Sequence, residues 1–248
     1  MKNTGWWLLI GLLFLVCLCD AEAQQFSEGK FQAIFARSTL SYSDVNLTDS
    51  FNLSRDSVLK EINVATVLNG RYRLKYAAIL PNSQTGTGIP LASFVINGYI
   101  FAPSDTDKKS TAPVTVETTG QSQRFEFECL QGWSTFFQPK LMGEYLTSNV
   151  KVTGKSSDNQ KGDIVEAKDS FNKFLFGLGA TGYQRQNSFL VKYEVAYTFA
   201  DKGWFVDLGG RYDSVQGFVD IGWRLEQHTM GPFQITYQGP YADVGWKF

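Results

Sequence analysis

Apolar and polar residues alternate along most of the chain, in short segments that are separated by polar breaks. The clearest segment runs from Phe189 to Phe199, where every second residue is Phe, Val or Tyr and where Lys192 and Glu194 occupy the opposite face. A period of two is the pattern of a β-strand. A tilted strand of about 9–11 residues also has the length that crosses a bilayer.

The same alternation predicts strands elsewhere, and their number follows from how they must pair. The further candidates are residues 34–42, 58–68, 72–80, 91–102, 124–137, 145–153, 174–183, 204–212, 219–225 and 242–248, with a weaker one at 114–118. Several connections are too short for crossover helices, so the strands pair antiparallel. Single-chain bacterial barrels have even strand numbers. The pattern therefore favours a twelve-stranded antiparallel transmembrane β-barrel, with ten strands as the alternative and no helical domain.

The breaks between segments predict turn types and sidedness. The sequence Leu68-Asn69-Gly70 marks a tight hairpin. A three-residue loop puts Val64 on the face of Tyr72, which keeps the apolar residues together, and is favoured over a two-residue loop. The breaks at 103–111 and 154–173 are long and charged, whereas those at 184–188, 200–203 and 213–217 are short. Long outer loops and short inner turns are typical of outer-membrane barrels.

The N-terminal segment has the features of a secretory signal peptide. Lys2 precedes an apolar run over residues 6–16, and Ala21-Glu22-Ala23 supplies a small-x-small cleavage pattern. We expect residues 1–23 to be a signal peptide and residues 24–248 to form the barrel.

Charge and cysteine content narrow the function. Without residues 1–23, the 23 basic and 24 acidic side chains fall to 22 of each. Such a balance argues against nucleic-acid binding. Cys129 alone remains of three cysteines, so neither an intramolecular disulfide nor a thiolate metal cage is expected. No cofactor is predicted.

The last residues carry a family resemblance. Ala242, Val244, Trp246 and Phe248 alternate at the C-terminus. This resembles the C-terminal signature of bacterial outer-membrane β-barrels of the porin-like and OmpA-type small class, although Asp243 stands where that pattern usually has Gly. The resemblance implies a place in the outer membrane of a Gram-negative bacterium, contact with membrane lipid, and recognition of Trp246 and Phe248 by the barrel-assembly machinery.

Aromatic residues near strand ends fit the same class. Such barrels use aromatic girdles at both interfaces, and the candidates here are Trp204, Tyr212, Trp223 and Trp246. The alternative is a soluble lipocalin-like barrel, in which these side chains would point inward. A lipocalin has eight strands and normally a helix, which fits the pattern poorly.

Three C-terminal segments repeat an acid, a glycine and a base at alternate positions, over residues 207–211, 220–224 and 243–247. These side chains share one face of each strand. If Leu208 and Ile221 face lipid, the charges line the lumen. The predicted lumen ladder is Lys192, Glu194, Asp207, Arg211, Asp220, Arg224, Asp243 and Lys247.

The ladder predicts specific partners across neighbouring strands. The expected pairs are Arg211 with Asp220, Asp207 with Arg224, Arg224 with Asp243, and Asp220 with Lys247. Each such pair stabilises a sheet by about 0.2–1 kcal/mol. A balanced ladder suits either a charge-compensated, filled interior or a lining that passes small polar solutes.

Catalysis has little support in the sequence. His228 is the single histidine, and residues 226–233 are expected to form an exposed loop at the barrel rim. No recognised catalytic, metal-ligand or phosphate-binding arrangement is present. The sequence thus favours a small porin or channel-like protein for small polar solutes, not an enzyme. The alternative is a non-conducting structural or surface-interaction barrel of adhesin-like type.

Overall fold

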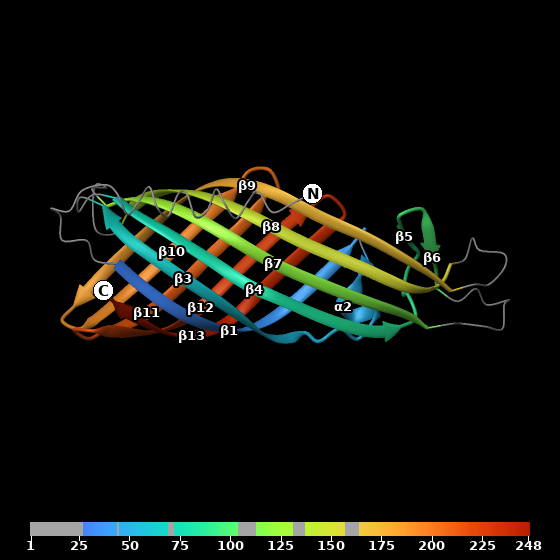
Figure 1. Ribbon diagram of the computed structural model, residues 1–248, viewed down its shortest axis with the longest axis horizontal. Coiled ribbons are helices and arrows are strands. Elements are labelled where there is room, and N and C mark those ends of the chain that lie inside the picture. Colours follow the sequence, from blue (N-terminus) through green and yellow to red (C-terminus); the bar gives the residue numbers. More distant parts are fainter. Residues whose placement is uncertain (1–26, 44, 69–71, 104–112, 131–136, 157–163) are drawn as a thin grey trace.

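The computed structural model describes residues 27–43, 45–68, 72–103, 113–130, 137–156 and 164–248. Over these ranges the chain is a closed antiparallel β-barrel (Figure 1). The ten barrel strands are β1 (Ser27–Tyr42), β3 (Asp56–Leu68), β4 (Tyr72–Gly88), β7 (Val114–Cys129), β8 (Gln138–Lys155), β9 (Ile164–Gln186), β10 (Phe189–Thr198), β11 (Gly203–Asp213), β12 (Gly217–Met230) and β13 (Phe233–Lys247). Each pairs with the next, and β13 pairs with β1 to close the ring. No helix of the described residues is long and apolar enough to cross a membrane.

The favoured count of twelve strands is wrong, and the alternative of ten is confirmed. Residues 91–102 do not enter the barrel; they form a separate hairpin of β5 (Phe94–Ile96) and β6 (Tyr99–Phe101). Residues 114–118 are the beginning of β7, which continues without a break to Cys129. The polar stretch at 118–123 looked like a connection because it has no apolar face, yet it is strand throughout.

Two other predicted breaks are also largely strand. β8 extends to Lys155 and β9 begins at Ile164, so the expected loop over 154–173 is shorter than its polarity indicated. β12 continues to Met230, inside the expected rim loop. The hairpin between β3 and β4 follows the three-residue register, because Leu68 lies opposite Tyr72 and Val64 opposite Tyr76. Residues 69–71 themselves, like residues 1–23, lie outside the described ranges.

The barrel is apolar outside and charged inside, the reverse of a soluble protein. Leu208 and Ile221 are 50% and 65% exposed on the outer face, whereas Asp220 on the inner face is fully buried. The four girdle aromatics predicted from the sequence are also exposed on the outer face, which makes the lipocalin-like alternative wrong. An exposed apolar surface around a closed sheet requires lipid. The chain is therefore a transmembrane β-barrel of the outer-membrane type.

The apolar outer belt covers only part of the longest strands. On β9 the outward residues are apolar at Phe174, Phe176 and Leu178, and polar from Asn172 back towards Glu166. The outward Lys151 of β8 pairs with Glu166 at 3.2 Å. Since β4, β7, β8 and β9 have 16–23 residues, more than the roughly 9–11 that a bilayer needs, they project beyond the membrane at one end.

The two ends of the barrel differ. At one end lie the start of β1, the end of β13 and short connections at 187–188 and 214–216; at the other lie the two long connections 43–55 and 89–113, together with the short turns 199–202 and 231–232 (Figure 1). Outer-membrane barrels keep short turns in the periplasm and long loops outside. By that rule the projecting strands, β5 and β6 face the cell exterior.

The main apolar core fills this outer end. The connection after β1 folds inward as β2 (Val45–Asn46) and the short helix α2 (Leu47–Ser50), which Asn46 caps by accepting a hydrogen bond from the backbone N–H of Asp49. Gly86 of β4 lets this segment approach, because a Cβ there would lie 2.1 Å from the carbonyl oxygen of Phe51. We call the resulting cluster the outer plug. Its buried members are Tyr42, Val45, Leu47, Phe51, Leu53, Phe94, Ile96, Phe101, Val114, Val116, Leu146, Val150, Val152, Ala167, Leu175, Phe233 and Ile235.

Candidate functional site: the charged lumen

Two of the four expected ladder pairs are present. Arg211 lies directly opposite Asp220, and its Nε donates to Oδ1 at 2.7 Å. Asp207 lies opposite Arg224, whose Nη2 donates to it at 2.9 Å. Both pairs follow from the short turn at this end of the two strands, where Asp213 lies opposite Phe218. All four side chains point into the barrel and are buried.

The other two expected pairs are wrong. β12 and β13 align so that Asp220 lies opposite Asp243, and Arg224 lies opposite Gly239. Two carboxylates directly opposite each other are destabilising, but Lys30 of β1 lies 2.8 Å from Asp243 and 3.9 Å from Asp220. The compensating charge thus comes from the strand that closes the ring. Lys30 lies outside the three C-terminal segments from which the register was predicted.

The remaining ladder members bind elsewhere. Lys192 pairs with Asp220 at 2.7 Å. Glu194 lies opposite Asp207 and forms ion pairs with Lys75 of β4 and Lys140 of β8. Lys247 does not reach the ladder; it lies at the periplasmic rim, 3.0 Å from Asp213.

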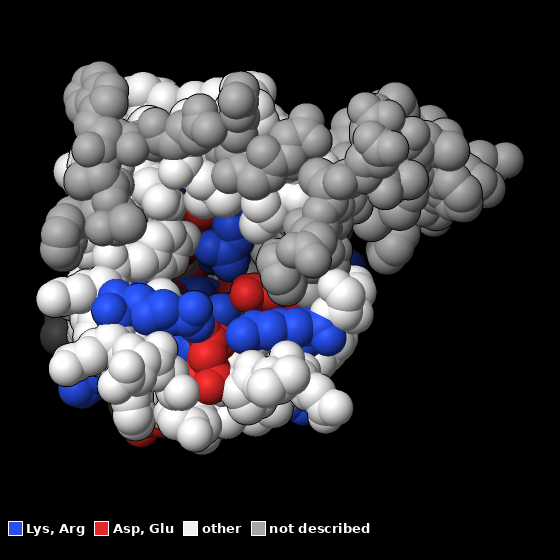
Figure 2. Space-filling model, turned by 90° about the vertical axis from the view of Figure 1, so that its left-hand side faces the viewer, with Lys and Arg blue, Asp and Glu red and all other residues white. Residues whose placement is uncertain are grey.

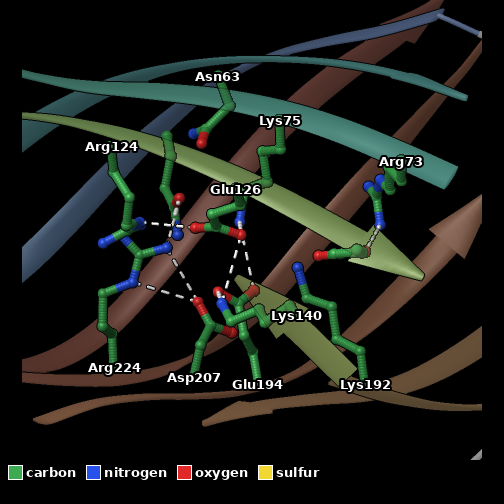
Figure 3. A network of polar contacts seen from close by, with 12 residues as sticks. Asn63, Arg73, Lys75, Arg124, Glu126, Lys140, Lys192, Glu194, Asp207 and Arg224 are labelled. Atoms are coloured by element: carbon green, nitrogen blue, oxygen red, sulfur yellow. Dashed lines mark hydrogen bonds and ion pairs between the residues drawn. The ribbon is translucent and has the colours of Figure 1, made fainter. Parts of the chain in front are cut away.

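A layer of paired charges crosses the middle of the lumen (Figure 3). We call it the central charge layer; its members are Glu61, Lys75, Arg124, Glu126, Lys140, Glu194, Asp207 and Arg224. Arg224 of β12 reaches Glu61 of β3 at 2.7 Å, and Lys75 of β4 reaches Glu194 at 3.2 Å. Neither pair joins neighbouring strands of the sheet. The layer therefore ties strands that are not neighbours in the sheet together across the lumen.

Five members of this layer were not predicted from the sequence, although the alternation of charged and apolar residues could have indicated some of them. These five are Glu61, Lys75, Arg124, Glu126 and Lys140. In residues 124–128, Arg124, Glu126 and Glu128 alternate with two phenylalanines, which is the pattern of a strand between lipid and a charged lumen. The structure places Arg124 1% exposed, with its Nε 2.7 Å from Glu126 and its guanidinium 4.1 Å from the ring centre of Phe205.

His228 is buried, not exposed in a rim loop as expected. It lies on the inner face of β12 and is 2% exposed. Its Nδ1 is 2.8 Å from Asp201, which lies in the turn between β10 and β11, and its Nε2 is 3.1 Å from Glu226 and 3.7 Å from Glu144. Burial raises the pKa of Asp201, but hydrogen bonds from His228 and Thr198 outweigh it and hold that pKa below its ordinary value. Glu144, Glu226 and His228 form what we call the histidine cluster, beneath the outer plug.

Among the residues that the structure describes, nothing closes the periplasmic end of the lumen. A cavity of about 970 Å³ lies there, and its lining includes Glu28, Lys30, Arg73, Lys192, Arg211 and Lys247. Figure 2 looks into this end and shows basic and acidic side chains gathered in the opening. Arg73 pairs with Glu28 at 3.4 Å, and Arg211 pairs with the same carboxylate at 3.0 Å. From periplasm to exterior, the lumen thus contains a charged vestibule, the central charge layer, the histidine cluster and the outer plug.

The two residues predicted to guide assembly lie at the closing seam. Trp246 of β13 points outward and packs on β1, where a Cβ at Gly29 would come within 2.7 Å of the indole. Phe248 follows the strand and is 65% exposed. Their recognition by the assembly machinery stays a prediction.

Comparisons with known proteins give relatives in structure alone. No protein-family model and no curated protein sequence matches the chain. Among solved structures, the outer membrane protease OmpT from Escherichia coli is 11% identical, with 92% of this chain and 97% of that chain covered and a TM-score of 0.46. Ail, the attachment invasion locus protein of Yersinia pestis, solved with the heparin analogue sucrose octasulfate, is 6% identical over 91% and 100% of the chains, with a TM-score of 0.40.

The toluene transporter TodX of P. putida is 9% identical, with 92% of this chain and 90% of that chain covered and a TM-score of 0.37. A protease, an attachment protein and a transporter thus resemble the same barrel. At identities this low and TM-scores below 0.5, we infer nothing about this chain's activity from theirs.

Proposed function

We propose that the chain is a non-conducting barrel that presents its outer end at the cell surface, and not a porin. The observation that carries this proposal is the outer plug, which fills the mouth of the lumen with apolar side chains. Leu47, Phe51 and Ile96 have no exposed surface, and Phe233 has 1%. A hydrated ion would lose its water among these groups without gaining polar contacts, and apolar constrictions of this kind stop conduction.

The central charge layer supports the same function. A conducting pore needs groups that bind a solute and release it again. Here Arg224 is 3% exposed and already divides its guanidinium between Glu61, Asp207 and the side-chain oxygen of Gln32. Removing such a partner would leave buried charge uncompensated, so a passing ion competes poorly for these groups.

The exterior end has the features of a presented surface. Beyond the apolar belt, the outer plug lies among the projecting ends of β4, β7, β8 and β9. We call this part of the barrel, together with β5 and β6, the cap; the outer plug is its core. On this cap Leu91 is 74% exposed and Val95 is half exposed. Contiguous exposed apolar surfaces mark interaction sites, and we propose that Leu91 and Val95 belong to one. This favours the surface-interaction alternative over passage of small solutes.

Conductance of the purified, refolded protein in planar bilayers tests the closed lumen. We expect no reproducible open steps from protein whose folding is established by heat-modifiable gel mobility. Regular steps from the folded protein would overturn the proposal and restore the porin interpretation.

Cysteine labelling in intact cells tests which end is presented. In a Cys129→Ser background, Leu91→Cys should react with a membrane-impermeant maleimide in whole cells. Val215→Cys, 94% exposed in the turn at the opposite end, is the matched control and should react only after the outer membrane is permeabilised. The reverse pattern would contradict surface presentation of the cap.

A further inference from the structure

The histidine cluster has the geometry of a metal site. One ligand atom each from Glu144, Glu226 and His228 lies within 4.8 Å of the others, and all three residues are buried. Ligands of a tetrahedral zinc ion at about 2.0–2.1 Å are separated from one another by about 3.3 Å. The Nε2 atom of His228 is 3.1 Å from Glu226 and 3.7 Å from Glu144, which brackets that separation.

The orientation of the imidazole fits metal binding. A metal-bound histidine almost always donates its other ring N–H to a carboxylate or carbonyl. Here Nδ1 faces Asp201 at 2.8 Å, and Asp201 is fixed in turn by the hydroxyl of Thr198 and by the backbone N–H of Gly203 at 3.2 Å. With Nδ1–H donated to Asp201, a metal ion at Nε2 would take the place of the proton that Nε2 shares with Glu226 at 3.1 Å.

One buried carboxylate oxygen of the cluster is available to bind a cation. Glu144 is 1% exposed, and its Oε1 has no hydrogen-bond partner among the described residues. A buried carboxylate oxygen without a partner carries a large desolvation cost. The other oxygen of this carboxylate, Oε2, lies 3.7 Å from Nε2 of His228.

A second acidic cluster in the same lumen provides the contrast. Glu126, Glu128 and Glu194 lie equally close together. There, Lys75 reaches Glu126 at 3.1 Å and Arg73 reaches Glu128 at 3.6 Å, so side-chain cations already compensate the carboxylates. Around the histidine cluster, the described Lys or Arg side chain in contact is Arg124, 3.5 Å from Glu226 and shared with Glu126; the other compensating charge is that of His228 itself when it is protonated.

The geometry points to a binding site for one divalent transition-metal ion of the zinc class, with His228 Nε2 and a carboxylate oxygen from each of Glu144 and Glu226 as ligands, beneath the outer plug. Asp201 orients the imidazole and does not bind the ion. Because the ligands come from β8 and β12, and Asp201 from the β10–β11 turn, the ion would tie three parts of the wall together where the plug begins. This site goes beyond the proposed function and does not depend on it.

Refolding with metal tests the site, because a buried ion is loaded most readily as the barrel closes. The full chain is unfolded in urea and refolded into detergent with or without ZnCl₂, and bound zinc is measured after free metal is removed. We expect about one zinc per folded chain. Glu144→Gln and His228→Gln should each weaken binding more than tenfold, and Asp201→Asn by about 10–100-fold.

Asp243→Asn is the matched control, since Asp243 is a buried lumen carboxylate that binds Lys30 at 2.8 Å, outside the cluster. It should retain full zinc binding. Refolding with Co²⁺ adds a measurement that needs no variant, because a four-coordinate site with a nitrogen ligand gives a strong visible spectrum. Folded wild-type protein without stoichiometric zinc, or equal zinc in wild type and Glu144→Gln, would overturn the site. If protonated His228 alone compensates the two glutamates, the folded wild-type protein will not bind stoichiometric zinc.

Discussion

Arg211 of β11 and Asp220 of β12 lie directly opposite each other inside the barrel and are joined by two hydrogen bonds, Nε to Oδ1 at 2.7 Å and Nη2 to Oδ2 at 3.2 Å. The guanidinium also packs 3.7 Å from the ring centre of Phe218 and binds Glu28. Asp220 binds Lys192 in addition. The pair thus belongs to a larger network of ion pairs. Replacing Arg211 and replacing Asp220 therefore leave different numbers of charged groups without a partner.

That asymmetry predicts the result of a double-mutant cycle. Arg211→Ala should be the milder change, because Lys192 continues to compensate Asp220. Asp220→Ala removes the ion pair of Lys192 at 2.7 Å and leaves Arg211 with Glu28, so it should cost about 3–5 kcal/mol of unfolding free energy. The double variant should be more stable than the sum of the single effects implies, by about 0.5–3 kcal/mol. Urea unfolding in detergent or lipid vesicles measures all three, and strictly additive effects would show that the two residues do not interact.

A charged substitution on the outer face should destabilise the barrel within the apolar belt but not beyond it. Leu208 is 50% exposed at the middle of the outward row of β11, so Leu208→Arg should lower the unfolding free energy by about 2–4 kcal/mol. Asn172→Arg, which also points outward but from the projecting part of β9, is the control and should change it by less than about 1 kcal/mol. Urea unfolding in lipid vesicles measures the unfolding free energy of both variants. Equal destabilisation would show that the apolar belt extends to position 172.

The alternation of residues revealed the barrel because lipid and lumen impose opposite polarities on the two faces of a strand. It failed where that contrast ends. Beyond the belt, outward positions such as Thr119 and Gln121 of β7 meet water and need not be apolar, so a continuous strand resembles a loop. The same effect hid the last part of β12, where His228 alternates with Gln227 and Thr229 and lacks apolar neighbours that would mark it as inward-facing.

The lumen was predictable only where strands adjacent in sequence determine the contact. Arg211 and Asp220 are joined by a short turn, which sets their register. The partner of Asp243 is Lys30, 213 residues away, and their contact depends on ring closure between β1 and β13. The number of strands between β4 and β10 fixes how these two strands face each other, so the contact of Lys75 with Glu194 follows only once the count of ten is known.

Cell fractionation tests where the protein resides. We expect it in the outer-membrane fraction, with a folded form that migrates differently on gels before and after boiling, because the closed hydrogen-bonded ring resists unfolding by detergent at room temperature. Recovery as a soluble periplasmic protein whose mobility boiling does not change would contradict the transmembrane assignment.

The last prediction separates assembly from stability at the C-terminus. Phe248 follows β13 and is 65% exposed, so the folded barrel gains little from it. If the assembly machinery reads this aromatic, as the resemblance implies, Phe248→Asp should strongly reduce the heat-modifiable protein in the outer membrane of cells. The same protein refolded after purification should unfold within about 1 kcal/mol of wild type, as expected for an exposed site. Lys168→Asp, at an outward position on the projecting part of β9, is the control and should accumulate normally. Equal accumulation of both variants would show that Phe248 carries no assembly signal, whereas an equal loss of stability and accumulation would make it a structural residue of the seam.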